Sequence, residues 1–198
     1  MSFRQKVRKR VVAFVKARLD KRGYRLARNC QDYRSETSKC RERLAPFCLG
    51  YGVDLGFGGD PITETAIRVD MAQPYARTGS YQVQLGGDAT KLHWFNDAVL
   101  DFVYSSHLLE DFEDTRAVLL EWLRVLRPEG RLVIFCPDEQ VYREHCRRTG
   151  QPYNEHHKVR DFSLAKVTNI LGEIGATKIV YENPLVDNYS WELVAEKL

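Results

Sequence analysis

The chain has 198 residues, 43% of them hydrophobic, which is enough for one domain with a buried core but not comfortably for two. No apolar run approaches the roughly 18 residues of a membrane-spanning helix, so the sequence predicts a soluble protein. The five cysteines contain no CxxC pair and are odd in number, which disfavours a disulfide framework and favours reduced, cytosolic thiols.

The net charge of +3 is divided unevenly along the chain. Residues 1–28 contain eleven Lys and Arg against one acid, Asp20, whereas residues 29–198 contain 19 basic and 26 acidic residues, a net charge of −7. In the first segment, apolar residues recur at helical spacing, cations fill the other face, and Gly23 follows as a stop. These features predict a basic amphipathic helix in residues 1–28, ahead of a domain that spans residues 29–198.

This basic leader is compatible with more than one partner. A helix of this kind can lie on an anionic membrane surface through residues 1–24, or it can dock on the domain with a solvated basic face. Nucleic acid is a less favoured partner. The composition also suits a mitochondrial transit peptide, but no cleavage site is evident.

The body of the chain alternates between strand and helix patterns. Residues 29–48 are polar and predict a loop with a short helix, "SKCRERLA". Strands are expected near 51–55, 66–70, 81–86, 99–105, 131–136, 177–182 and 190–196, and helices near 115–126, 138–148 and 163–174. In the helix at 115–126, Thr115 is the expected N-cap. This alternation predicts an α/β fold with a mostly parallel sheet and helices on both faces.

Two connections depart from a standard dinucleotide-binding fold. The last two strands are joined by a loop too short for a crossover helix, so the final strand must run antiparallel in a sheet of about seven strands. Only 11 residues, 56–66, separate the first two strands, which is about the minimum for a parallel crossover. The sequence therefore predicts a Rossmann-like fold with a shortened first crossover.

Acidic residues and glycines follow successive predicted strands. Asp54, Gly56 and Gly58 follow the first strand, Asp70 ends the second, and Asp88 comes shortly after the third. Each alone is also ordinary turn chemistry. Ligands of open α/β sheets bind outside the carboxyl ends of the strands, where an acid can accept both hydroxyls of a ribose. Their recurrence at successive strand ends predicts a nucleoside-type ligand.

The segments that carry these residues resemble the class I S-adenosylmethionine-dependent methyltransferases, most closely the small type 11 subgroup with uncharacterised bacterial members. The resemblance covers about residues 50–198 and rests on "GVDLGFGG", "IRVD", "GDATKL", "LDFVYSSHLLEDFED", "LLEWLRVLRPEGRLVIFCPD" and "HKVRDFSLAKVTNILGEIGA". The resemblance implies S-adenosylmethionine as the cofactor and S-adenosylhomocysteine as the product.

Site residues follow from the same resemblance. It implies that the cofactor is bound by Asp54, Gly56, Phe57, Gly58, Asp70, Met71, Asp88, Ala89 and Ser105. In that arrangement Asp54, the Gly56–Gly58 backbone and Ser105 face the methionine part. Asp70 faces the ribose, and Asp88 and Ala89 face the adenine.

The sequence also departs from the family pattern. The third glycine of the first motif is replaced by Asp60, and the helix that usually follows the glycines is short or absent. These departures motivate an alternative function, a binding or scaffold protein that retains the cofactor fold without catalysis. A nicotinamide-dependent oxidoreductase is a third and less favoured reading.

Methyl transfer needs a base only when the acceptor is a poorly acidic hydroxyl or a protonated amine. His107 follows the fourth strand and is the candidate base, although such a histidine can also simply orient its loop. Candidate acceptor-binding residues are Glu110, Tyr142, His156 and His157.

The expected acceptor is a small molecule or a glycan. The leader segment "RGYRLAR" resembles leaders of bacterial surface-polysaccharide proteins, which suggests a cytoplasmic enzyme peripheral to the inner face of the membrane. The spacing of Cys136, Cys146, His156 and His157 matches no zinc pattern, so no metal is expected.

Overall fold

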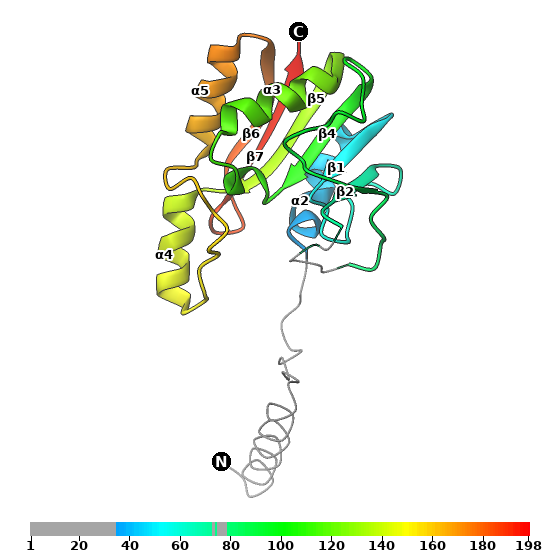
Figure 1. Cartoon of the computed structure of the whole chain (residues 1–198). Helices are drawn as coiled ribbons and strands as arrows, with labels where there is room; N and C mark the ends of the chain where they lie inside the picture. Colours follow the sequence, from blue (N-terminus) through cyan, green and yellow to red (C-terminus); the bar gives the residue numbers. More distant parts are fainter. Residues whose placement is uncertain (1–34, 73, 75–78) are drawn as a thin grey trace, which may run out of the picture. The chain divides into compact units, whose positions relative to one another are not determined.

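The computed structural model describes residues 35–72, 74 and 79–198 (Figure 1). The basic helix predicted for residues 1–28 lies outside these residues. Among the helices of the described segments, none is long and apolar enough to cross a lipid bilayer.

The described part of the chain alternates between strands and helices, as the sequence predicts (Figure 1). The strands are β1 (Gly52–Leu55), β2 (Ile67–Asp70), β3 (Leu85–Gly86), β4 (Leu100–Ser106), β5 (Leu126–Pro137), β6 (Thr177–Val186) and β7 (Ser190–Lys197). The helices are α2 (Glu36–Leu44), α3 (Thr115–Val125), α4 (Glu139–Thr149) and α5 (Leu164–Ile174), with the 3₁₀ turns η1 (Ala45–Phe47) and η2 (Leu109–Asp111).

The strands form one seven-stranded sheet in the order β3-β2-β1-β4-β5-β7-β6. The first five strands pair in parallel, and β7 runs antiparallel to both of its neighbours. The antiparallel final strand follows from its short connection to β6, because a turn of a few residues cannot return the chain to the same end of the sheet. The predicted fold class is confirmed, including the antiparallel strand.

Both faces of the sheet are covered. Alternate strand residues belong to two separate core clusters, so that Ile134 packs with Trp122 of α3 and Leu171 of α5 on one face. Phe135, the next residue of β5, packs on the other face in a cluster that includes Leu44 of α2. The period-2 alternation of strand side chains explains this division.

The first crossover contains no helix, as predicted. Residues 56–66 connect β1 to β2 as turns and bends, and the two strands pair in parallel with Val53 opposite Ile67. The connection buries its own apolar side chains, Phe57 at 3% exposure and Ile62 at 1%. These residues supply the packing that a crossover helix would otherwise provide.

Several element boundaries differ from the sequence-based predictions, among them the end of β6, which runs to Val186 rather than to 182. Strand β3 is only Leu85–Gly86, because the preceding segment bonds to β2 through isolated contacts, such as Gln84 N to the Arg68 carbonyl at 2.9 Å. The N-cap of α3 is Asp114, whose carboxylate accepts from Ala117 N at 2.9 Å, so the expected cap at Thr115 is wrong by one residue. Strand β5 begins at Leu126, directly after α3 and five residues earlier than predicted.

Candidate active site

A cavity of about 580 Å³ lies at the carboxyl ends of the parallel strands. It is lined by residues 56–58 after β1, 70–72 and 74 after β2, 86–89 after β3, 106–108, 111 and 112 at and after the end of β4, and 35–37 at the start of α2. This is the position where open α/β sheets bind ligands, because the carboxyl ends of neighbouring parallel strands meet at one edge. The predicted convergence of strand-end segments is therefore observed.

The glycine turn after β1 brings backbone close to this cavity. Gly56, Gly58 and Gly59 have φ values of 68°, 59° and 90°, in the left-handed region that favours glycine. A Cβ added to Gly56 would come within 2.9 Å of Leu108 Cδ2, so a side chain there would displace the cavity wall. Because these glycines have no side chain, a ligand in the cavity can approach the backbone of the turn closely.

Asp70 is fixed beside the glycine turn. Its Oδ2 accepts from Gly58 N at 3.2 Å and its Oδ1 accepts from Met71 N at 2.8 Å. Burial raises the pKa of this carboxyl, and the two amides oppose the rise. Asp70 is therefore oriented by its neighbours, and each oxygen can accept a further hydrogen bond from a ligand.

Asp88 and Ala89 line the cavity after β3. Thr90 donates to Asp88 Oδ1 from both its amide and its hydroxyl, at 2.8 and 2.7 Å, and the hydroxyl contact lowers the pKa of this carboxyl. The Ala89 carbonyl accepts from Trp122 Nε1 at 2.8 Å, which ties this loop to α3. Trp94 packs against Gly87 outside the cavity lining, since a Cβ on that glycine would meet its ring at 1.9 Å.

Two of the residues implied to bind the cofactor lie outside the cavity lining. Asp54 is fully buried and supports the first crossover, because its Oδ2 accepts from Ile62 N at 2.7 Å; burial raises its pKa well above the usual range. The Ser105 hydroxyl donates to the Leu55 carbonyl at 3.2 Å. The next residue, Ser106, lines the cavity instead, and its buried hydroxyl has no hydrogen-bond partner among the described residues.

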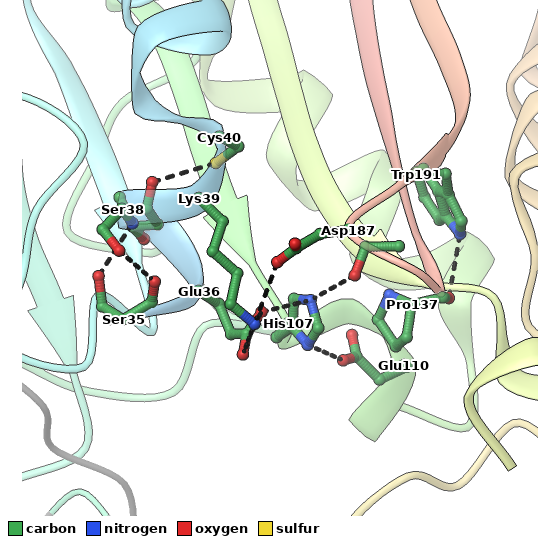
Figure 2. Close-up of polar contacts among 12 residues, drawn as sticks. Ser35, Glu36, Ser38, Lys39, Cys40, His107, Glu110, Pro137, Asp187 and Trp191 are labelled. Atoms are coloured by element: carbon green, nitrogen blue, oxygen red, sulfur yellow. Dashed lines mark hydrogen bonds and ion pairs between the residues drawn. The ribbon is translucent and has the colours of Figure 1, made fainter. Parts of the chain in front are cut away.

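His107 lies on the cavity wall at the end of β4 (Figure 2). Its φ of 49° is left-handed, and its amide donates to the Phe135 carbonyl at 2.8 Å, which holds the residue in this conformation. Its Nε2 lies 3.2 Å from Ser190 Oγ and 3.3 Å from Glu36 Oε2. Burial lowers the pKa of His107 to about 4, with Glu36 opposing the shift, so the imidazole is neutral at neutral pH.

The start of α2 contributes cavity residues that the sequence analysis missed. Ser35, Glu36 and Thr37 line the cavity. Glu36 is bound by Lys39 Nζ at 2.7 Å, and Lys39 lies 3.5 Å from Asp187 in the β6–β7 turn (Figure 2). The sequence predicts a short helix in this region. It does not predict that the first turn of this helix lies at the carboxyl edge of the sheet, where the cavity is.

Asp60, which replaces a family glycine, is not among the residues that line the cavity, although it is bonded to Ser35, which is. Its Oδ1 lies 2.6 Å from Arg41 Nη2, and its Oδ2 accepts from the Ser35 hydroxyl. The carboxylate is thus paired with a guanidinium of α2, which offsets its charge near the glycine turn.

None of the four predicted acceptor-binding residues lines the cavity. Glu110 is fully buried behind His107. The His157 side chain is 3% exposed, with Nδ1 2.8 Å from Glu139 Oε2, and Tyr142 packs against it with ring centroids 5.1 Å apart. His156 is exposed, and its amide donates to Asn154 Oδ1 at 3.1 Å. The structure therefore brings Glu110, Tyr142 and His157 together in a cluster separate from the cavity surface.

Comparison with known proteins finds a match to one family model over part of the chain. Residues 53–134 match the family model described as "Methyltransferase domain" (Methyltransf_11), and no curated protein matches the sequence. The PH0226 protein from Pyrococcus horikoshii OT3 is similar in structure, with a TM-score of 0.62 and 22% identity, over 86% of this chain and 93% of that chain.

Two further structures of known class share the fold. A SAM-dependent methyltransferase from Archaeoglobus fulgidus has a TM-score of 0.62 and 18% identity, over 81% of this chain and 92% of that chain. A SAM-dependent methyltransferase from Aquifex aeolicus has a TM-score of 0.54 and 15% identity, over 81% and 93% of the respective chains.

Proposed function

We propose, from the premise that this chain carries a methyltransferase domain of the class I S-adenosylmethionine-dependent fold, that it methylates a small-molecule or glycan-type acceptor. The observation that carries the proposal is the convergence of the glycine turn, Asp70 and Asp88 on one cavity. These groups come from three successive strand ends, as a ligand with an amino acid, a ribose and an adenine requires.

The residues present fit such a cofactor. Asp70 would accept from the ribose hydroxyls, since its oxygens retain accepting capacity beside Gly58 and Met71. Asp88 and Ala89 would contact the adenine. The buried Ser106 hydroxyl, which has no hydrogen-bond partner among the described residues, would take part in binding the methionine end in place of the expected Ser105.

Asp54 and Phe57 would act mainly by holding the glycine turn in position. Asp54 does so through its bond to Ile62 N, and Phe57 through its burial at 3% exposure. The Gly56–Gly58 backbone would then approach the methionine part without interference from a Cβ.

S-adenosylmethionine supplies the activated methyl group. The contribution of the chain is to hold an acceptor in line with that group, which alone can lower the barrier by several kcal/mol. His107 lines the cavity and would take the acceptor's proton, because its imidazole is neutral at neutral pH. Glu36 would accept a hydrogen bond from the acceptor beside it. Tyr142 and His157, which do not line the cavity, would contribute only by packing beneath the residues of the acceptor side.

Ligand binding tests the proposal directly. We expect isothermal titration with S-adenosylhomocysteine to show binding to the full chain, and D70N to weaken it about 10- to 100-fold, because a charge-assisted hydrogen bond is worth roughly 1.5–3 kcal/mol. The matched control is D161N, since Asp161 is exposed, does not line the cavity and pairs with Lys166. No binding at millimolar ligand, or equal effects of both variants, would contradict the proposal.

The helix-free first crossover favours one alternative, a cofactor-fold binding protein without catalysis. No helix follows Gly58 before β2, so no helix N-terminus supports the methionine carboxylate there. The ion pair of Asp60 with Arg41 offsets the charge of Asp60, the other departure that motivated this alternative. Formation of S-adenosylhomocysteine from the methyl donor with any acceptor in a panel of amines, phenols and sugars would exclude it.

A nicotinamide oxidoreductase is disfavoured by the sheet. Strand β7 lies between β5 and β6 and runs antiparallel to both, whereas dinucleotide-binding sheets follow the order 3-2-1-4-5-6 with parallel strands.

A further inference from the structure

Helix α2 begins at the carboxyl edge of the sheet, where the main cavity lies. Its N-cap and the next two residues, 35–37, all line that cavity. Glu36 of the first turn reaches His107, just beyond the end of β4 (Figure 2). Further along the helix, Cys40 Sγ lies 3.2 Å from the Tyr104 hydroxyl, within that strand. The helix therefore runs antiparallel to β4 and to its parallel neighbour β1.

A crossover helix after the first strand of an α/β sheet has this same direction, and it places its N-terminus beside the glycine turn. This chain has no helix in residues 56–66. Instead, α2 is bonded to that connection, because the Ser35 hydroxyl and Arg41 Nη2 both donate to the carboxylate of Asp60, next to the glycine turn. Helix α2 thus brings a helix N-terminus to the glycine turn although the crossover helix is missing.

Two backbone amides at the start of α2 are available to a ligand. The first amides of an α-helix have no carbonyl acceptor within the helix. The Ser38 amide donates to Ser35 Oγ at 2.9 Å. The amides of Glu36 and Thr37 take part in no hydrogen bond with another described residue. Such amides, together with the partial positive charge of a helix N-terminus, favour the binding of an anion.

The acids on and beside the first turn of α2 are paired with cations. Asp60 Oδ1 lies 2.6 Å from Arg41 Nη2, and Glu36 Oε1 lies 2.7 Å from Lys39 Nζ. Each cation offsets the charge of its carboxylate. The two acids therefore do not oppose an anion at this position as unpaired carboxylates would.

The buried hydroxyl of Ser106 independently indicates a ligand at the same position. Strand β4 pairs with β1 so that Ser105 is opposite Leu55, which places Ser106 level with Gly56. Ser106 is 8% exposed and lines the cavity, and its hydroxyl has no hydrogen-bond partner among the described residues. Because a buried hydroxyl without a partner destabilises a fold, this one indicates a ligand acceptor at the end of β4.

The strand order determines which part of the cofactor reaches α2. The order β3-β2-β1-β4 sets Asp88, Asp70, the glycine turn and Ser106 along the cavity in that sequence. With the adenine at Asp88 and the ribose at Asp70, the methionine part lies where β1 and β4 end. The first turn of α2 contacts the chain beyond these same two ends, through Asp60 and His107. The anionic group of the methionine part is its α-carboxylate.

We propose that the N-terminus of α2 takes the place of the missing crossover helix and binds the α-carboxylate of the cofactor. The amides of Glu36 and Thr37 donate to the carboxylate, and the Ser106 hydroxyl is a further donor. This contact lies outside the sequence match, because α2 precedes residues 53–134, the segment that matches the family model. The proposal rests on the proposed function for the identity of the cofactor.

Two ligands that differ only in the carboxylate test this role of α2. Isothermal titration of the full chain compares S-adenosylhomocysteine with its decarboxylated analogue, S-adenosyl-3-thiopropylamine. We expect the carboxylate to tighten binding to the wild type by about 10- to 100-fold, because hydrogen bonds to charged groups are the stronger ones.

The substitution E36P removes one of the two amides at a position where the helix tolerates it. Glu36 is the first helical residue, where proline is favourable, and Ser35 has φ −57° and ψ 154°, which suit a residue before proline. The matched variant is E36A, which also lacks the carboxylate of Glu36 but keeps its amide. We expect the preference for S-adenosylhomocysteine over the analogue to be about tenfold smaller in E36P than in E36A, while the analogue binds both variants equally.

Should E36P not fold, S106A gives the same measurement, since loss of the hydroxyl should weaken the binding of S-adenosylhomocysteine and leave the analogue unchanged. An equal preference in E36P and E36A, a wild-type preference in S106A, or equal binding of the two ligands to the wild type would overturn the role of α2 and leave the proposed function standing. If neither ligand binds the wild type at millimolar concentration, the proposed function itself fails, and the role of α2 fails with it.

Discussion

At the scale of single residues, this domain buries several ionisable groups, and burial shifts the pKa of three of them strongly. Asp54 and Glu110 are fully buried, the His107 side chain on the cavity wall is 16% exposed, and burial is the largest cause of the pKa shift in each. Burial disfavours the charged form, so it raises the pKa of the two acids and lowers that of the imidazole. Glu110 and His107 are therefore neutral at neutral pH, burial favours the neutral form of Asp54, and stability depends on pH through these groups.

For Glu110 the sign of that dependence is definite. Its pKa of about 8 in the folded chain exceeds the usual 4.5, so the native state holds a proton that the unfolded chain releases between these values. The free energy of unfolding therefore falls as pH rises from about 4.5 to 8, by up to about 1.4 kcal/mol per pH unit.

We expect E110Q to remove this contribution, so that its stability relative to the wild type increases by a few kcal/mol between pH 5 and pH 8. Urea unfolding at the two pH values measures the difference, with E155Q as the control that keeps the wild-type dependence. His107 contributes with the opposite sign: its pKa of about 4 lies below the usual 6.5, and stability falls as pH drops between these values in both chains. Identical pH dependence in wild type and E110Q would show that Glu110 is ionised in the fold.

At the scale of elements, the first crossover contains a loop in place of a helix, and side chains of β1 and α2 hold this loop by hydrogen bonds. The Asp54 carboxylate accepts a hydrogen bond from the amide of Ile62. Arg41 of α2 donates to the Asp60 carboxylate at 2.6 Å and to the Pro61 carbonyl at 3.1 Å. Helix α2 precedes β1 in the chain and covers the face that a crossover helix would share. The glycine turn therefore depends on a helix outside the segment that matches the methyltransferase family model.

This dependence predicts the effect of R41A. Loss of the guanidinium leaves Asp60 unpaired and frees the loop, so we expect faster hydrogen exchange at Ile62 N and a loss of about 1 kcal/mol in stability, modest because both partners are about one-third exposed. The control is R116A, whose contact with Glu173 is exposed and 4.0 Å long. Equal exchange at Ile62 in the two variants would show that α2 does not hold the loop.

At the scale of the whole molecule, charge separates the leader from the domain. Residues 1–28 carry eleven basic side chains, while the main cavity is lined by Glu36, Asp70, Asp88 and Asp111 and by no Lys or Arg of the described segments. An acidic cavity suits a cationic sulfonium, and a basic leader suits an anionic surface. The two parts of the chain thus favour ligands of opposite sign.

The leader's charge predicts membrane-surface binding that depends on lipid charge. We expect the full chain to co-sediment with vesicles that contain phosphatidylserine and not with phosphatidylcholine alone, since each cation near an anionic surface contributes about 1 kcal/mol. Deletion of residues 1–24 should abolish this binding and leave S-adenosylhomocysteine binding unchanged. Co-sedimentation that persists after the deletion would refute a membrane role for the leader.

The lining of the cavity was predictable where its residues follow strand ends, and not where a shift of one residue changes which side chain faces the cavity. Asp70, Asp88 and the glycine turn were found because glycines and acids mark the ends of strands in the sequence itself. The sequence predicted a cavity contact for Ser105, but the neighbouring Ser106 lines the cavity instead. Successive strand residues point to opposite faces of the sheet, so an error of one residue selects the wrong side chain.

The sequence by itself determined the type and order of the elements and the antiparallel end of the sheet, because hydrophobic period, turn residues and connection length are local properties. Only the tertiary structure decided that Glu36 of α2 meets His107 and that Glu110 meets His157. Those contacts join segments 71 and 47 positions apart, and their existence depends on which edge of the sheet each segment reaches. No local pattern encodes that choice, since it results from packing of the whole core.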